Sequence, residues 1–331
     1  MENQFSAERE IPVLYMVVPC YNEEEVITKT AAVMKEKLAR LVSENKIRQG
    51  SKVLFVNDGS KDSTLRILHE LSSEDSIFGV LSFAGNYGHQ SAILAGMMEA
   101  RHYADVVVTI DADLQQDIEA LDLFLKSYME SAEVVYGVRN DRSSDGFMKK
   151  TTATMYYKLM HMLGSNVLTN HADYRLMSHK ALNALAEYGE SSLFLRGLIP
   201  TMGFPSDVVY FDVKEREAGK SKYTFKKMMT LAIDGITSMS VRPLRIITGL
   251  GFITVLAAIA MTIYTFVDWC MGNAVQGYTT LLMVTLIIGG VIILSLGIIG
   301  EYIGKVYLET KKRPRYIIDT VKLRDCERKE D

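Results

Sequence analysis

Two carboxylates stand two residues apart in TIDADLQQD, the stretch from Thr109 to Asp117. They are Asp111 and Asp113, and they follow an apolar run, VVVTI, whose β-branched residues are typical of a buried strand. Side chains two residues apart at a strand end point to the same side, so these carboxylates repel each other unless a cation lies between them. Mg²⁺ and Mn²⁺ prefer hard oxygen ligands and often share them with a substrate phosphate. The pattern predicts a divalent metal site for a phosphate-bearing substrate.

The same motif has a purely structural explanation, in which Asp113 caps a helix that starts near Gln116. D-x-D alone does not decide between the two. Four further polar clusters also follow apolar runs, namely PCYNEEE from Pro19, NDGSKDST from Asn57, FAGNYGHQ from Phe83 and GVRND from Gly137. Each could be turn or capping chemistry taken singly. Their coincidence at the ends of successive apolar runs favours the chemical interpretation.

Alternating strands and helices must position these clusters. Five apolar runs predict strands, at 13–18, 52–56, 78–83, 106–110 and 134–138. Four stretches with helical periodicity follow the first four runs, at 23–41, 63–71, 89–101 and 118–129. This alternation predicts βαβ units and therefore an α/β fold with a mainly parallel sheet covered on both faces. Because ligands bind outside the carboxyl ends of such strands, we expect the polar clusters to meet at one edge.

Composition and missing motifs exclude several classes of protein. The 331 residues carry a formal net charge of −3, which gives no argument for nucleic-acid binding. Neither a GxGxxG dinucleotide fingerprint nor a GxxxxGK[ST] phosphate loop is present. Phosphates would therefore be held by a metal and by basic side chains. Cys20, Cys270 and Cys326 are far apart and are interpreted as free thiols of a reducing compartment.

Two charge-free stretches near the C-terminus, 246–267 and 279–300, each match the roughly 20 apolar residues that span a bilayer as a helix. The loop between them, DWCMGNAVQGY, contains no Lys or Arg, whereas basic residues flank both stretches on the outside. By the positive-inside rule, both flanks are expected in the cytoplasm and the loop outside. The sequence predicts a multi-pass protein of the inner or plasma membrane with both termini cytoplasmic.

Four regions follow from this division of the chain. We expect a cytoplasmic catalytic domain over 1–223 and juxtamembrane interfacial helices over 224–243. Two transmembrane helices over 244–304 and a cytoplasmic basic tail over 305–331 complete the chain. The segment REAGKSKY, from Arg216 to Tyr223, would lie between the catalytic domain and the bilayer.

In this order, the motifs resemble those of family 2 glycosyltransferases with an A-type nucleotide-sugar fold. The resemblance is strongest to polyprenyl-phosphate glycosyltransferases, such as the bactoprenol glucosyltransferases and dolichol-phosphate mannose synthases. It covers nearly the whole chain, through VPCYNEEEVI, VNDGSKDST, NYGHQSAILAGMMEA, DADLQ, VYGVRNDR, ADYRLMSHKAL, REAGKSKY and the two spans. It also implies a homotetramer and contact with the lipid bilayer.

The resemblance implies roles for individual residues. The donor-binding residues would be Pro19, Tyr21, Glu23, Asp58, Asp111, Ala112 and Arg139. Asp113 would bind Mg²⁺ or Mn²⁺ with help from Gln115. Arg139, Arg216 and Lys222 would face phosphates. The catalytic residues would be Asp111, Asp113, Asp173, Arg216 and Lys222.

Asp173, in ADYRLM, matches a position proposed in the resembling family as an acceptor-side base. A lipid phosphate is already ionised at pH 7 and needs little help from a base. Three alternatives stay open: Asp173 positions the sugar, pairs with Arg175, or caps the helix that runs toward Ala186. His89 and His171 lie near motifs without metal-ligand spacing, and are interpreted as structural or donor-pocket groups.

The resulting hypothesis is a membrane-anchored inverting glycosyltransferase. It would move a hexose from a nucleotide sugar, UDP-glucose in the first instance, to undecaprenyl or another polyprenyl phosphate at the cytoplasmic face. One alternative is a non-catalytic membrane scaffold that binds nucleotide sugars. Another is a processive polysaccharide synthase, which usually carries QxxRW and more spans; the single Trp, Trp269, lies in the external loop instead.

Overall fold

The computed structural model describes residues 9–140, 171–189, 194–212, 242–271, 277–324 and 326. The chain divides into two compact units, one holding the sheet and the other holding two long apolar helices. Three predicted features, namely Arg216 with Lys222, the juxtamembrane segment 224–241 and the loop residues 272–276, lie outside the described residues.

In the described part of the chain, eight strands form one sheet in the order β7-β5-β6-β4-β1-β2-β3-β8. Their bounds are β1 Leu14–Cys20, β2 Lys52–Asn57, β3 Phe78–Phe83, β4 Val106–Thr109, β5 Val134–Arg139, β6 His171–Ser178, β7 Ser206–Phe211 and β8 Ile318–Lys322. The pairs β1–β2, β1–β4, β2–β3 and β5–β7 are parallel, whereas β6 and β8 run antiparallel to their neighbours. The predicted mainly parallel α/β sheet is confirmed.

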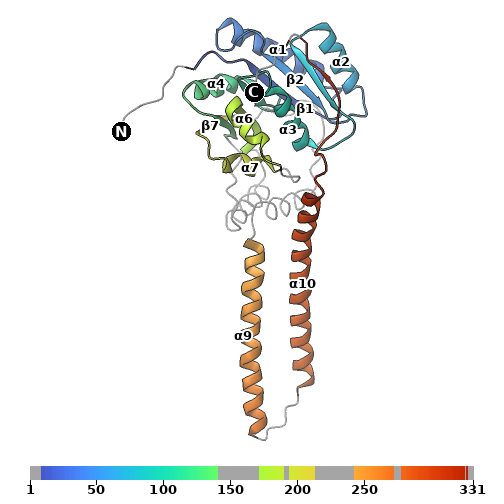
Figure 1. Cartoon of the computed structure of the whole chain (residues 1–331), viewed down its shortest axis with the longest axis vertical. Helices are drawn as coiled ribbons and strands as arrows, with labels where there is room; N and C mark the ends of the chain where they lie inside the picture. The colour runs from blue at the N-terminus through green and yellow to red at the C-terminus, as the bar shows by residue number, and fades with distance from the viewer. Residues whose placement is uncertain are drawn as a thin grey trace, which may run out of the picture. The chain divides into compact units, whose positions relative to one another are not determined.

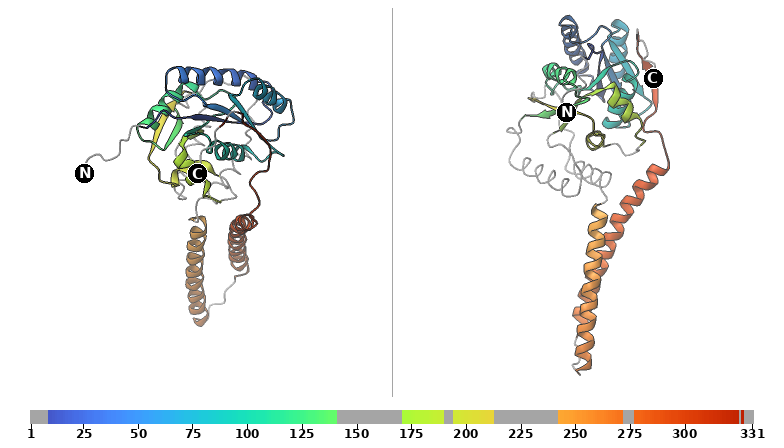
Figure 2. Two further views of the ribbon diagram at one scale, coloured as in Figure 1. Left: turned by 45° about the horizontal axis from the view of Figure 1, so that its top comes forward. Right: turned by 60° about the vertical axis from the view of Figure 1, so that its left-hand side comes forward.

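Helices cover both faces of this sheet (Figure 1). Their bounds are α1 Ile27–Ser43, α2 Thr64–Glu74, α3 His89–Ala100, the short 3-10 helix η1 Ile118–Ala120, α4 Leu121–Met129, α6 His179–Ala186 and α7 Leu195–Thr201. Figure 2 shows α1 and α3 on opposite faces of the sheet. In α1 the buried positions include Ile27, Ala31, Met34 and Leu38, whose three- and four-residue spacing gives the helix one apolar side. That side packs on the strands and orients the loops at their carboxyl ends.

Gly96 lets α3 approach the sheet closely. A Cβ at this position would lie 2.3 Å from Cγ1 of Val17 and 2.8 Å from Cγ2 of Val56. Both neighbours are β-branched and stiff, so they cannot turn away without strain. We expect Gly96→Ala to lower the free energy of unfolding by about 1–3 kcal/mol, the usual cost of overpacking. Chemical denaturation measures it, with Gly189→Ala as control because nothing lies within 4 Å of a Cβ there; equal stability of the two variants would contradict the packing argument.

β8 lies within 305–331, the segment predicted from the sequence to be a basic tail, and is a strand that the sequence did not predict. Four of its five residues pair antiparallel with β3, and the Ala84 backbone N–H donates to the Ile317 carbonyl at 3.0 Å. The Tyr316 ring stacks on Phe83 with centroids 5.1 Å apart. Figure 2 shows this C-terminal segment, coloured red, beside the sheet. A short, polar, exposed edge strand carries too little apolar alternation to be recognised from sequence.

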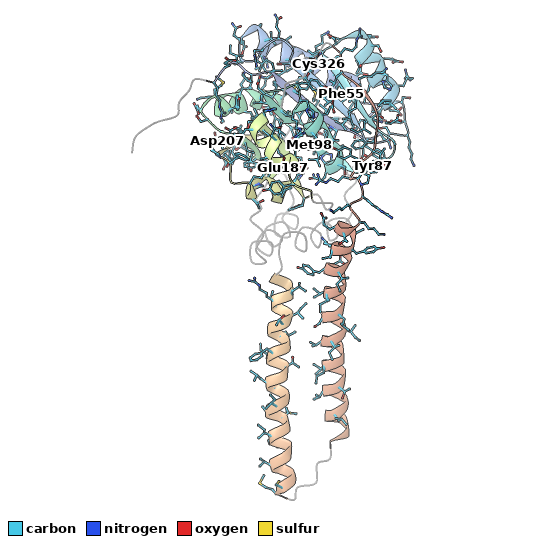
Figure 3. All side chains as sticks on the ribbon, in the orientation of Figure 1. Phe55, Tyr87, Met98, Glu187, Asp207 and Cys326 are labelled. Carbon is cyan, nitrogen blue, oxygen red and sulfur yellow. The ribbon has the colours of Figure 1, made fainter. Side chains whose placement is uncertain are left out.

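The second unit contains α9, Arg242–Cys270, and α10, Tyr278–Thr310. Both helices are long and apolar enough to cross a membrane, by length and composition. The predicted stretches 246–267 and 279–300 fall within them. Large apolar side chains such as Phe252, Tyr264 and Ile293 are exposed along the two helices, whose side chains Figure 3 draws as sticks. Helices that expose so much apolar surface are typical of a lipid environment.

Candidate functional site

The predicted clusters meet at the carboxyl edge of the sheet, and β6 brings a further carboxylate to them. Because β6 is antiparallel to both β4 and β5, its first residues lie at the edge where those strands end. Thr109 pairs with Arg175, so the register continued by two residues sets Asp111 opposite Asp173. The Thr109 hydroxyl donates to the Asp173 carbonyl and joins the two strands there. Residues more than sixty positions apart thus form one site.

The DADLQ loop after β4 is held rigidly by its neighbours. The Gln116 side chain donates to Asp111 Oδ2 at 2.6 Å, while its Oε1 accepts from the Asp111 backbone N–H at 3.0 Å. Thr30 of α1 donates its hydroxyl to the Ala112 carbonyl at 2.6 Å. Leu114 adopts a φ of +54°, a left-handed conformation that costs a non-glycine residue roughly 1–2 kcal/mol. Such a conformation persists only when surrounding contacts enforce it.

The capping alternative for Asp113 does not describe the local structure. The side chain that caps η1 is Asp117, which accepts a hydrogen bond from the Glu119 backbone N–H. Asp113 accepts from the Gln115 backbone N–H at 3.2 Å, a bond within the loop itself. The buried amide that bonds Asp111 belongs to Gln116, which the sequence analysis did not single out. The metal role of Asp113 and Gln115 stays a prediction.

The donor set at this edge fits a divalent cation that also binds a substrate. Burial raises the pKa of Asp111, and the neighbouring carboxylates Asp173 and Asp113 raise it further, against the opposing effect of His89. A cation beside Asp113 would relieve that repulsion. Among the described residues no group of three or more His, Cys, Asp or Glu side chains could hold a metal. An ion here would take its remaining ligands from water and the substrate diphosphate, as Mg²⁺ commonly does.

Asp173 is buried at the centre of a polar cluster, which we call the Asp173 cluster: Asp173, Arg175, Arg196, His89 and Gln90. Arg196 of α7 binds the carboxylate with two nitrogens, Nε to Oδ1 at 3.0 Å and Nη2 to Oδ2 at 2.8 Å. Arg175 Nη2 donates to Oδ1 at 2.7 Å, and Gln90 Nε2 donates to Oδ2 at 3.2 Å. These four donors match the roughly four lone-pair sites of an ionised carboxylate.

The electrostatics of the cluster keep Asp173 ionised. Burial by itself would raise the pKa of Asp173, but Arg196, His89 and Arg175 together hold it well below its usual range. A carboxylate with so low a pKa is a weak general base near neutral pH. The pairing with Arg175 that the sequence analysis left open is observed, and Asp173 lies within β6 instead of capping α6.

His89 begins α3 and lies between two carboxylates. Its Nε2 is 3.5 Å from Asp173 Oδ2 and 3.7 Å from Asp111 Oδ1. Burial would lower the pKa of His89, but the neighbouring carboxylates of Asp173 and Asp111 raise it on balance. The two carboxylates thus favour the protonated form of the imidazole.

The loops after β1, β2 and β3 are joined to one another at the same edge. Pro19 is the second-to-last residue of β1, and Tyr21 directly follows the strand. The Glu23 backbone N–H donates to Thr64 Oγ1 at 2.9 Å, which ties the loop after β1 to the start of α2. Asp58 is buried and accepts from the backbone N–H groups of Tyr87 at 2.6 Å and Gly88 at 2.9 Å. Tyr87 is labelled in Figure 3. Asp58 thus holds the loop that leads to His89, and its predicted contact with the donor stays a prediction.

Arg139 ends β5, where it pairs in register with Phe211 of β7, and it is half-buried. Sequence reasoning missed Arg196, because α7 is remote in the chain and carries no motif signal. It assigned His89 only a structural or donor-pocket role, although His89 belongs to the polar cluster FAGNYGHQ after β3. Only the packing of α3 and α7 around β6 brings these side chains together.

Two family models match this chain. The model described as glycosyl transferase family 2 matches residues 15–186, which contain the edge just described. The model described as the GtrB C-terminal hairpin matches residues 242–306, which contain α9 and most of α10. The family match and the observed sheet agree with the A-type fold expected from the sequence.

Several curated proteins are similar over nearly their whole length. An uncharacterized glycosyltransferase of Bacillus subtilis, YkoT, is 45% identical over 93% of this chain and 91% of its own. The prophage bactoprenol glucosyl transferase homolog of Escherichia coli K12 is 38% identical over 93% and 98%. The bactoprenol glucosyl transferase of Shigella phage SfX is 37% identical over 93% and 99%.

Proposed function

Because this chain belongs to glycosyl transferase family 2, we propose that it transfers a hexose from a nucleotide sugar to a polyprenyl phosphate, with inversion at the anomeric carbon. The observation that supports this proposal most directly is that one chain contains both the sheet edge with Asp111 and Asp113 and the C-terminal hairpin of α9 and α10. The phage SfX relative, named a bactoprenol glucosyl transferase, is matched over 99% of its length, hairpin included. That agreement supports undecaprenyl phosphate as acceptor and UDP-glucose as donor.

The residues at this edge of the sheet would have different roles in the reaction. Pro19, Tyr21, Glu23 and Asp58 would bind the nucleoside, with Asp111 and Ala112 near the ribose or sugar. Arg139 would bind the diphosphate by a charge-assisted hydrogen bond. Mg²⁺ or Mn²⁺, held by Asp113 with help from Gln115, would stabilise charge on the leaving nucleoside diphosphate as a Lewis acid.

A single displacement accounts for the transfer. A phosphate oxygen of the acceptor forms a bond to the anomeric carbon, while the bond from that carbon to the diphosphate oxygen breaks and UDP leaves with the electron pair. In-line attack inverts the centre, so an α-linked donor gives a β-linked lipid. The acceptor phosphate is already ionised at neutral pH, so the step needs no strong base. The low pKa of Asp173 agrees with this.

The proposal is tested with full-length protein in detergent, undecaprenyl phosphate and a panel of nucleotide sugars. We expect a product of one hexose linked to the lipid phosphate, detected by mass spectrometry, with UDP-glucose as the preferred donor. A scaffold would bind nucleotide sugar without forming product, and a processive synthase would form polymer. Either of these outcomes would replace the proposed function.

We further propose that α9 and α10 cross the bilayer with both flanks in the cytoplasm. Arg242 and Arg245 precede the first span, basic residues follow the second, and the short connecting loop contains no Lys or Arg. A variant whose single cysteine replaces Asn273 should react with an impermeant maleimide from outside intact cells. The matched variant with its single cysteine at Arg315 should react only after lysis. The reverse pattern would contradict this topology.

A further inference from the structure

The members of the Asp173 cluster differ sharply in exposure. The side chains of Asp173 and Arg175 are 4% and 0% exposed, so a ligand cannot reach them directly. The side chains of His89 and Arg196 are 46% and 39% exposed, and Asp111 beside them is 32% exposed. The buried carboxylate therefore holds two donors that a substrate can touch.

The donors in this cluster are not fully used by the protein. His89 Nε2 lies 3.5 Å and 3.7 Å from its two carboxylates, beyond the about 2.7–3.2 Å of a good hydrogen bond. Gln90 Oε1 and two nitrogens of Arg175, Nε and Nη1, are buried with no hydrogen-bond partner within the part of the chain that the structure describes. Buried polar atoms are nearly always paired, so water is the partner expected for these buried atoms, whereas the half-exposed His89 is open to a polar group of the substrate.

The charges around the cluster favour a neutral, hydroxyl-bearing ligand over an anion. A phosphate at His89 would meet Asp111, and Asp113 stands two residues further along the same loop. A hydroxyl both donates and accepts, so it can bond a carboxylate and a cationic donor at once. The transferred hexose is the part of the substrate with that chemistry.

We propose that His89 and Arg196, held in place by Asp173, donate hydrogen bonds to hydroxyl groups of the transferred hexose and help to select the sugar. Asp173 acts through these two residues and is a positioning residue. The inference rests on the proposed function for the identity of the sugar donor. It assigns the sugar-binding contacts to α3 and α7, which lie on either side of β6 in the sequence.

The first experiment compares the binding of UDP with that of UDP-glucose by calorimetry, on full-length protein in detergent. In His89→Gln and Arg196→Lys, the UDP affinity should be unchanged, whereas the UDP-glucose affinity should fall about 10- to 100-fold, the range for hydrogen bonds to charged groups. His69→Gln and Arg66→Lys on α2 are matched controls and should bind both ligands normally. An equal loss for both ligands would indicate a phosphate or structural role and overturn the proposal, as would no loss.

The second experiment tests whether Asp173 acts through this pair. Asp173→Asn should lower kcat/KM strongly in the wild type, but by much less in the His89→Gln/Arg196→Lys background, because coupled residues are non-additive. The same loss in both backgrounds would show that Asp173 acts on substrate itself. If Asp173→Asn does not fold, because Arg175 is left buried without its partner, the calorimetry still decides the proposal.

A third comparison measures the ratio of kcat/KM for UDP-glucose and UDP-galactose, which differ at one hydroxyl. His89→Gln or Arg196→Lys should shift this ratio, since a site built to bond a hydroxyl discriminates through it; an unchanged ratio in both would overturn the selection role.

The binding experiment needs no acceptor. Failure of the wild type to form lipid product would therefore contradict the proposed acceptor without deciding the sugar contacts.

Discussion

Replacement of Asp113 by alanine is expected to abolish sugar transfer while the protein stays folded. Asp113 lies in a loop held by Gln116 and Thr30, next to a carboxylate whose pKa is raised by burial and by like charges. Loss of the cation that this edge fits would leave the leaving diphosphate without its main charge stabilisation. The loss should exceed the about 10²–10³-fold that follows removal of one preorganised donor. Initial rates with saturating donor and acceptor measure it.

The matched control is Asp319→Ala, an exposed carboxylate on β8, which should keep full activity. Chelation of divalent metal should abolish the transferase activity of the wild type, and added Mg²⁺ or Mn²⁺ should restore that activity. Full turnover by wild type in excess chelator would contradict the metal hypothesis. A thermal unfolding transition of Asp113→Ala equal to that of wild type separates loss of chemistry from loss of fold.

Arg216→Ala and Lys222→Ala are each expected to lower kcat on the order of 10²-fold, comparable to losing one preorganised donor. Both belong to REAGKSKY, which follows β7 in the sequence and lies outside the described residues. An ionised lipid phosphate must approach a donor diphosphate of the same sign. Cations at the meeting point reduce that repulsion, and they contribute most when charge moves to the leaving group. Single-turnover rates with saturating substrates measure the effect.

The competing explanation is a basic juxtamembrane stretch that only attracts anionic lipid. It is tested with a short-chain soluble acceptor in neutral detergent, where attraction to a membrane surface has no effect. The double variant Lys226→Ala/Lys227→Ala is the matched control, since it removes neighbouring charge from the same stretch. Near-normal turnover of Arg216→Ala and Lys222→Ala under these conditions would discard the phosphate-binding role.

Local patterns in the sequence were enough to predict much of the fold. β-branched runs and helical periodicity depend on neighbouring residues, so β1 to β5 and the helices that follow β1 to β4 could be read directly. Parallel strands share an edge, so Asp58, Asp111 and Arg139 could be assigned to it before any coordinates. The two charge-free stretches likewise predicted α9 and α10.

Tertiary structure decided what depends on contacts between distant residues. β6 enters antiparallel between β4 and β5 and so brings Asp173 to Asp111, while α7 and α3 add Arg196 and His89. The low pKa of Asp173 follows from that packing, because burial alone would raise it. β8 also required the fold, since its five exposed residues, IDTVK, show no apolar alternation and pair with the edge of β3. Sequence alone determined β1 to β5, the helices that follow β1 to β4 and the position of the hairpin, because these depend on local periodicity and hydropathy. The tertiary structure decided which charges meet, because that depends on strand order and register.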